Sequence, residues 1–263
     1  SIKPFLPKQH LLTYLDAVLR VYNRYGNRNN KYKARIKILV KAWTPDVFAE
    51  RVEAEWAQIL ARDVDGVAQL TSGEVERVKT FFPLPDYQSV DEAAMDAALQ
   101  AQASDNVAFS RWLERNVRNQ KQPGYAAVTL SLKPAGVAPG DVTDRQLESI
   151  AGLADQFSNG ELRTTHNQNI VIADVIKSQL FDFWQMAKAD GLATPTIGTI
   201  NDMICCPGGD YCSLANAKSI PVAEAIQRKF EDLDYVYDLG DLELNISGCM
   251  NACGHHHIGH IGI

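Results

Sequence analysis

The stretch Gly124-Tyr-Ala-Ala-Val-Thr-Leu-Ser-Leu132 has the two-residue alternation of a β-strand, with large apolar residues separated by small or polar ones. Thr143 and Gln146 then form a capping box for a helix that should end before Gly160. Two short strands and a helix follow, predicted over Glu161–Thr165, Asn169–Ala173 and Lys177–Lys188. The order β-α-β-β-α predicts a ferredoxin-like unit of the α+β class, with its helices on one face of a sheet.

The part before this unit is predicted to be mainly helical. The first helix should run from Lys8 to Tyr25, because apolar residues recur there at three- and four-residue spacing, at Leu11, Leu15, Leu19 and Tyr22. Two more helix starts are marked by Thr44-Pro45-Asp46 and by the capping pair Thr71 and Glu74.

Periodicity fades after these helices, in a stretch with Pro83 and Pro85 followed by an Ala- and Gln-rich run, which predicts a connector with at most a short helix. We therefore expect four parts: a helical region over 1–80, a linker over 81–108, the ferredoxin-like unit over 109–192, and a cysteine-bearing domain over 193–263. In the last part, the best predicted elements are a helix over Val222–Phe230 and a strand over Asp241–Ile246.

Composition excludes several classes of protein. The 263 residues are 46% hydrophobic and 22% charged, as is typical of a globular protein with a core. A net charge of −6 gives no basic field to attract nucleic acid or an anionic membrane. No apolar run approaches the roughly 20 residues needed to cross a bilayer, and no signal peptide is evident, so we expect a cytoplasmic protein without a membrane partner.

All five cysteines fall between positions 205 and 253, which indicates metal binding. Cys206 and Cys212 have five residues between them, whereas Cys249 and Cys253 have three. Structural zinc commonly uses pairs with two intervening residues, and a wider iron–sulfur cluster tolerates looser, glycine-rich loops. The spacing favours a cluster over zinc, and unligated buried cysteines are the third possibility. Cys205 should be a small buried residue.

Four histidines, His255, His256, His257 and His260, follow the last cysteine and raise a Cys/His zinc site as a competing hypothesis. Consecutive residues of an extended chain point to opposite sides, so the three adjacent histidines cannot all bind one ion. We interpret them as candidates to line a cofactor.

These cysteines resemble the motif of the sirohaem-dependent sulfite and nitrite reductases, C-x5-C followed by C-x3-C. The interval between the pairs is 36 residues, Ser213–Gly248. The segment Asn245-Ile-Ser-Gly-Cys-Met-Asn-Ala-Cys-Gly254 is similar to the GC-x-N-x-CG signature of that family. Other segments also look like this family, namely 5–12, 21–26, 31–37, 122–128 and 162–169. The match resembles bacterial haemoprotein subunits of sulfite reductase most.

The resemblance implies a set of cofactor residues. Cys206, Cys212, Cys249 and Cys253 would bind a [4Fe–4S] cluster, with Cys253 bridging to the iron of sirohaem. Asn251 would donate a hydrogen bond to a cluster sulfur. The carboxylates of sirohaem need cationic or donor partners, and if the basic stretch is helical, Asn27, Lys31 and Arg35 share one face and are candidates. Arg163, in an R-x-T motif, would be a structural counterpart of an anion-binding arginine.

The implied fold is a ferredoxin-like half-domain plus an α/β sirohaem/[4Fe–4S]-binding domain, preceded by the helical end of a first repeat. Ser1 in place of Met, and the strand-like segment His260-Ile261-Gly262-Ile263, suggest a fragment. In this family the residues that bind the anion come largely from the first repeat, so the catalytic residues are expected to lie outside this chain.

The resemblance implies the six-electron reduction of sulfite to sulfide in sulfur assimilation, with electrons from a flavoprotein reductase or a ferredoxin. Reduction of nitrite to ammonia on the same centre is the nearest alternative. A non-enzymatic iron–sulfur electron carrier is an alternative of a different class, although it would need far less chain. A structural zinc module is a further one.

Overall fold

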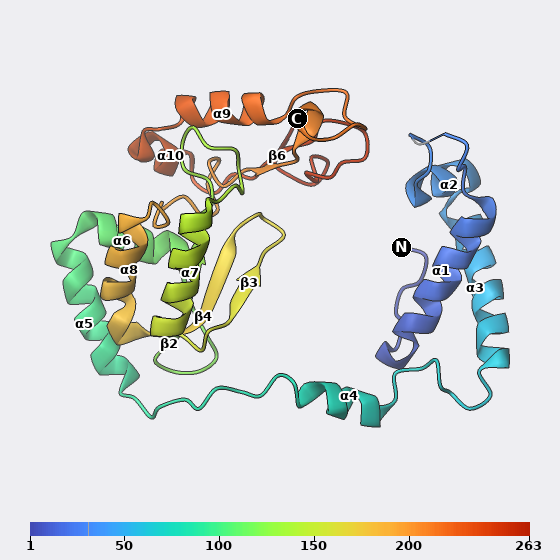
Figure 1. The fold of residues 1–263 in the computed structure, drawn as a ribbon, viewed down its shortest axis with the longest axis horizontal. Coiled ribbons are helices and arrows are strands. Elements are labelled where there is room, and N and C mark those ends of the chain that lie inside the picture. Colours follow the sequence, from blue (N-terminus) through green and yellow to red (C-terminus); the bar gives the residue numbers. More distant parts are fainter. Residues whose placement is uncertain (31) are drawn as a thin grey trace. The chain divides into compact units, whose positions relative to one another are not determined.

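A computed structural model describes residues 1–30 and 32–263, and these divide into two compact units, Ser1–Pro85 and Asp86–Ile263 (Figure 1). The boundary falls inside the stretch where the sequence predicts a linker. Among the helices of the described residues, none combines the length and the apolar character that crossing a membrane requires.

The first unit is helical. It contains the short 3-10 helix η1 (Lys8–His10) and the helices α1 (Leu11–Tyr25), α2 (Ile36–Trp43), α3 (Pro45–Arg62) and α4 (Ser72–Lys79). The predicted starts are confirmed for α3, which has Pro45 at its first position, and for α4, where the Thr71 hydroxyl accepts from the Glu74 N–H at 3.1 Å. Thr44 precedes α3 with a positive φ of 74° and makes no side-chain cap.

Helix α1 confirms the predicted element, but the leucines that indicated it are not its buried side. Leu11, Leu15 and Leu19 are about half exposed, whereas Tyr14 and Val21 are buried with the core of this unit. Helix α3 determines this orientation. The rings of Tyr14 and Trp56 lie edge to face with centroids 5.2 Å apart. The Tyr14 hydroxyl donates to the carboxylate of Glu53 at 3.0 Å. Burial, and then this hydrogen bond, raise the pKa of Tyr14 to about 12.

The connector contains more helix than predicted. Helix α5 (Glu92–Asp105) has 14 residues and belongs to the second unit, followed by α6 (Val107–Asn116). The expectation of at most a short helix was wrong because α5 has little apolar periodicity. Its Ala and Gln residues are strong helix formers all the same, and Asp91 caps it by accepting from the Ala94 N–H.

The ferredoxin-like unit is confirmed. Its antiparallel sheet has the strand order β1-β2-β4-β3, and the strands are β1 (Val117–Asn119), β2 (Tyr125–Leu130), β3 (Leu162–Thr164) and β4 (Ile170–Ile176). Helices α7 (Asp144–Phe157) and α8 (Leu180–Ala189) pack with the sheet in one core, and α8 is preceded by η2 (Lys177–Gln179) (Figure 1). The predicted capping box of Thr143 and Gln146 is present in full. Strand β1 was not predicted.

The cysteine-bearing region has a small parallel sheet of its own. The strand order is β5-β6-β7, with β5 (Ile204–Cys205), β6 (Leu244–Ile246) and β7 (Ile261–Gly262). Helices α9 (Ile220–Lys229) and α10 (Leu233–Leu239) connect β5 to β6, and η3 (Gly208–Asp210) follows β5. The predicted helix over 222–230 and the strand-like end of the chain are thus confirmed, although β6 is shorter than expected.

Candidate metal centre

The parallel sheet brings the two cysteine loops to one edge. Cys206 directly follows β5, and its N–H donates to the carbonyl of Ile246 in β6 at 3.1 Å. Cys249 lies three residues beyond the end of β6. Because β5 and β6 run in the same direction, both loops leave the sheet at its carboxyl edge, where α/β sheets commonly bind their ligands.

The two loops are in backbone contact. The Gly248 N–H donates to Cys206 Sγ at 3.0 Å, and the Gly248 carbonyl accepts from the Ala217 N–H at 3.1 Å. A Cβ atom at Gly248 would lie 2.9 Å from Gly208 Cα and 2.7 Å from the Ala217 carbonyl oxygen. Glycine is therefore required here for the loop of the first cysteine pair to touch that of the second.

The four cysteines of the motif differ in exposure. Cys206, Cys212 and Cys249 are partly buried, and Cys253 is exposed. Across the described residues, no group of three or more His, Cys, Asp or Glu side chains is placed to hold a single metal ion. Four thiols from two glycine-lined loops are the donor set of a [4Fe–4S] cluster, which is larger than one ion, so the chemistry of these residues fits that group.

Cys205 confirms the prediction of a small buried residue. It is 3% exposed and packs with the core of the small sheet. Its Sγ donates to the carbonyl of Cys206 at 3.3 Å. Burial raises the pKa of the Cys205 thiol to about 12, so this sulfur stays protonated at neutral pH.

Asn251 lies in the second cysteine loop, and its Oδ1 atom is buried with no hydrogen-bond partner among the residues that the structure describes. Leaving a buried polar atom unpaired costs about 1–3 kcal/mol. The oxygen and nitrogen of an amide have nearly the same shape, so a rotated amide would direct an N–H group into the same place. A group with sulfur acceptors bound at this loop would supply the missing partner.

Gln168 is a site residue that sequence reasoning missed. It lies between β3 and β4, and its side-chain amide hydrogen-bonds the backbone of Cys205 twice. Gln168 Nε2 donates to the Cys205 carbonyl at 2.9 Å, and Oε1 accepts from the Cys205 N–H at 2.8 Å. The amide thus fixes strand β5, which leads directly into Cys206. No local pattern indicates this contact, since β5 is only two residues long.

A buried ion pair next to this contact was also missed. Lys133 Nζ lies 2.7 Å from Asp202 Oδ1, and the side chains are 0% and 5% exposed. The same ammonium donates to the carbonyls of Asn167 and Asp202, and Asn169 Nδ2 donates to Asp202 Oδ1 at 2.9 Å. Burial lowers the pKa of Lys133, and the carboxylate of Asp202 opposes this shift. The pair joins the ferredoxin-like unit to the segment that enters β5.

The structure does not bring the predicted sirohaem residues onto one helical face. Asn27 is exposed in a non-helical stretch, Arg35 has extended backbone angles, and α2 begins only at Ile36. Lys31 lies outside the described residues. The helical hypothesis for this basic stretch is therefore wrong over the described positions, although the residues keep their charge and their donors.

Two further predicted groups, Arg163 and the four histidines, are mostly exposed, although His256 is half-buried. Arg163 is about half exposed, and its Nε donates to the carboxylate of Glu161 at 2.9 Å, which raises the pKa of the arginine. Among the histidines, His260 Nδ1 accepts from the Glu243 N–H at 3.0 Å, and His256 and His257 lie edge to face with ring centroids 5.5 Å apart.

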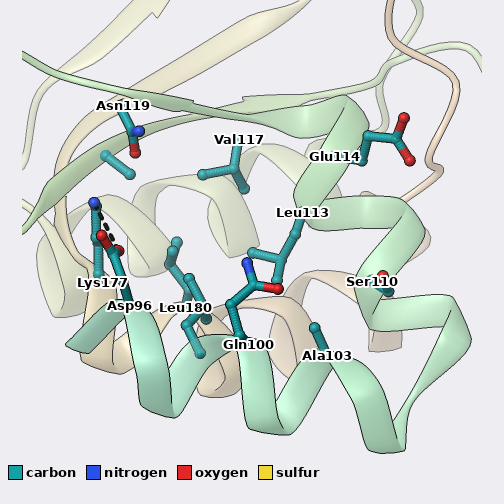
Figure 2. A pocket seen from close by; sticks show the side chains of 12 residues that line it. Asp96, Gln100, Ala103, Ser110, Leu113, Glu114, Val117, Asn119, Lys177 and Leu180 are labelled. Carbon is teal, nitrogen blue, oxygen red and sulfur yellow. Dashed lines mark hydrogen bonds and ion pairs between the residues drawn. The ribbon is translucent and has the colours of Figure 1, made fainter. Parts of the chain in front are cut away.

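The described residues also form cavities. One of about 130 Å³ has His166, Asp202, Asn245 and His255 in its lining. Another, of about 470 Å³, lies in the second unit between α5, α6 and β1, and both polar and apolar side chains line it (Figure 2). Lys177 is 3% exposed at this second cavity and pairs with Asp96 at 2.9 Å. Neither lining includes a cysteine.

Two family models match the chain. Residues 1–60 match the nitrite and sulphite reductase 4Fe-4S domain, and residues 118–190 match the nitrite/sulfite reductase ferredoxin-like half domain. The chain belongs to the nitrite and sulfite reductase family. Enzymes of this family use a [4Fe–4S] cluster and sirohaem, the two cofactors implied by the cysteine motif.

Curated relatives agree with this assignment, and a solved structure has the same fold. The chain is 25% identical over 262 residues to sulfite reductase (NADPH) hemoprotein beta-component 1 of Pectobacterium carotovorum, covering 98% of this chain and 39% of that protein. It is 24% identical over 266 residues to the chloroplastic ferredoxin–nitrite reductase of Arabidopsis thaliana, covering 98% and 37%. The chain thus spans about two fifths of the length of the curated relatives it matches.

The NirA protein of Mycobacterium tuberculosis has the same fold, with a TM-score of 0.64 at 23% identity, over 99% of this chain and 40% of NirA.

Proposed function

We propose that this chain carries the cluster-binding part of a sulfite reductase, which takes sulfite to sulfide with six electrons at a coupled sirohaem and [4Fe–4S] centre. The balanced reaction consumes one sulfite dianion, six electrons and seven protons, and it yields one hydrosulfide ion and three water molecules. The observation that carries the proposal is the convergence of the two cysteine loops at the carboxyl edge of β5 and β6.

In this proposal Cys206, Cys212, Cys249 and Cys253 are the ligands of the cluster. When bound, the coupled group supplies single electrons to the substrate. Cys253 would also hold sirohaem, since its exposure leaves it accessible to a second, larger group. Asn251 would satisfy its buried amide with a cluster sulfur.

Asn27, Lys31 and Arg35 remain candidates for the carboxylates of sirohaem because of their charge and donor groups, without the shared helical face. The Arg35 guanidinium is partly buried and donates to the Ala34 carbonyl at 2.9 Å, which leaves further N–H groups to bind a carboxylate. Arg163 is proposed to be structural, since Glu161 already pairs with it. We place the enzyme in the cytoplasm.

We propose the same four parts of the chain that the sequence predicts, with a shorter linker. Residues 1–80 would be the end of a first repeat, 109–192 the ferredoxin-like half-domain and 193–263 the cluster domain. The linker is shortened because α5 belongs to the second unit.

Nitrite reduction is the second candidate, favoured by the nearly equal identity to a ferredoxin–nitrite reductase. The names of these relatives are compatible with two electron donors, an NADPH-linked flavoprotein and a ferredoxin. The full-length holoenzyme should be assayed with sulfite and with nitrite at a matched supply of electrons. We expect the larger kcat/KM for sulfite, and a much larger value for nitrite would reverse the choice.

An absorption spectrum of the protein, purified without oxygen, separates the other classes. Sirohaem adds a Soret-type band that a plain iron–sulfur carrier lacks, and a metal analysis with zinc and no iron would indicate a zinc module. Serine substitution of Cys212 should remove the cluster absorption, whereas Cys205→Ala should retain it, because the buried Cys205 thiol stays protonated.

A further inference from the structure

Ser219 occupies the position before helix α9 but does not cap it. A serine at this position normally accepts a hydrogen bond from an N–H of the first helical turn. Here the side chain makes no such bond, and its backbone angles, φ −84° and ψ −41°, are helical instead of extended. Ser219 is 2% exposed. Its Oγ lies 3.5 Å from Cys206 Sγ, within hydrogen-bond reach of sulfur.

The two cysteine loops enclose this hydroxyl. A Cβ atom at Gly208 would lie 2.7 Å from Ser219 Oγ, and one at Gly248 would lie 3.0 Å from it. The hydroxyl thus fills the space that the two glycines leave open, next to the sulfur. Cys206 Sγ also accepts from the Gly248 N–H at 3.0 Å, so two donors lie against the same atom.

Chemistry fixes the direction of this hydrogen bond. In a free thiol, either the sulfur or the hydroxyl could donate. A cysteine bound to iron is a thiolate and has no proton, so Ser219 must donate to Cys206. The start of α9 adds the positive end of a 10-residue helix on the same side.

We propose that Ser219 tunes the iron–sulfur cluster by donating a hydrogen bond from its hydroxyl to the Cys206 thiolate. This inference rests on the proposed function, in which Cys206 is a cluster ligand. An added electron increases the negative charge on the ligand sulfurs, and a donor stabilises that charge more in the reduced than in the oxidised cluster. Ser219 therefore raises the reduction potential of the cluster and acts through Cys206 without contacting the substrate.

The test compares two serine-to-alanine variants of the holoprotein. Ser219→Ala removes the donor at Cys206 with little change in volume. Ser213→Ala, the matched control, removes an exposed hydroxyl beside Cys212. Redox titration followed by EPR gives the midpoint potential of each cluster, and iron analysis gives the cluster content. We expect a more negative potential in Ser219→Ala, full iron content in both, and the wild-type potential in Ser213→Ala.

A second measurement needs no variant. Pulsed EPR of the reduced wild-type protein in H₂O and D₂O should show exchangeable hydrogens coupled to the cluster, and Ser219→Ala should have lost one of them. The proposal is overturned by an unchanged potential, by an equal shift in both variants, or by no exchangeable coupling in wild type. It is also overturned if Ser219→Ala folds without binding iron, since a bond that only tunes is not needed for assembly. Wild-type protein without a [4Fe–4S] cluster would instead refute the proposed function.

Discussion

Replacing Asp202 by Asn removes the counterion of a fully buried lysine and should strongly destabilise the second unit. The substitution keeps the size of the side chain, so the main change is the loss of one negative charge 2.7 Å from Lys133 Nζ. Lys133 keeps its hydrogen bonds to the carbonyls of residues 167 and 202. Its charge therefore remains solvated by dipoles but is no longer neutralised.

The size of the effect follows from this geometry. Two unit charges 2.7 Å apart attract by about 6 kcal/mol at an effective dielectric constant of about 20. Part of this attraction offsets the cost of removing both charges from water. Measured losses on deleting one partner of a buried pair are about 3–5 kcal/mol. We expect Asp202→Asn to lower the free energy of unfolding by about 3 kcal/mol, at the lower end of this range because the Lys133 ammonium still donates to two carbonyl oxygens.

The deficit in the free energy of unfolding of Asp202→Asn, relative to wild type, should depend on pH in a defined direction. Burial lowers the pKa of Lys133 below its ordinary value of 10.5, and Asp202 opposes this, so the substitution lowers it further. At a pH below the Lys133 pKa of both the folded wild type and the folded variant, the variant bears the full cost of an uncompensated charge. Between these two pKa values, folded Lys133 is neutral in the variant and still charged in wild type, so only the variant gains stability as the pH rises. The deficit therefore shrinks toward alkaline pH.

Urea unfolding of wild type and variant, at several pH values from neutral upward, measures this deficit. Glu161→Gln is the matched control, because it makes the same chemical change in an exposed ion pair with Arg163. Exposed pairs are worth about 0–1 kcal/mol, so the control should change stability little. An Asp202→Asn deficit no larger than that of the control, or one that grows with pH, would refute the reasoning.

Three more predictions concern the cysteine loops. Gly248→Ala should lose bound iron, since its Cβ would lie 2.7 Å from a backbone oxygen of the facing loop. The control Gly152→Ala, whose Cβ would meet nothing within 4 Å, should keep the iron. The iron content per protein molecule distinguishes these outcomes. Gln168→Met removes two hydrogen bonds to Cys205 and should lower the free energy of urea unfolding by about 1–3 kcal/mol, and no loss would contradict the contact. Iodoacetamide at pH 8 should leave Cys205 of the folded protein unmodified by mass spectrometry, because burial raises its pKa to about 12.

The elements that could be predicted are those fixed by local chemistry. The capping box of Thr143 and Gln146 pairs backbone N–H groups at the start of α7 with neighbouring side chains, so four residues of sequence are enough to locate the helix start. The alternation over residues 124–132 likewise indicates β2, because one face of this strand is buried against the helices. Strands β1 and β5 have three and two residues, too short for any period to be visible.

Elements and contacts that depend on distant partners could not be predicted. The leucines of α1 have helical spacing, but the ring of Trp56 and the carboxylate of Glu53 select the Tyr14 side for burial. Lys133 and Asp202 are separated by 69 residues, and nothing in either local sequence distinguishes a buried lysine from an exposed one. In the same way, the spacing of the cysteines indicates a cluster but not that Gln168 fixes the strand before Cys206.

The interval between the two cysteine pairs has a structural meaning. Parallel neighbours such as β5 and β6 need a crossover connection, since a chain that leaves one carboxyl edge must return to the opposite end before the next strand begins. Here α9 and α10 form that connection, and both lie within the interval from Ser213 to Gly248. The separation therefore reflects the length of a crossover that brings Gly248 back to within 3.0 Å of the Cys206 sulfur. The two short cysteine motifs are far apart in sequence because they must leave the same sheet edge.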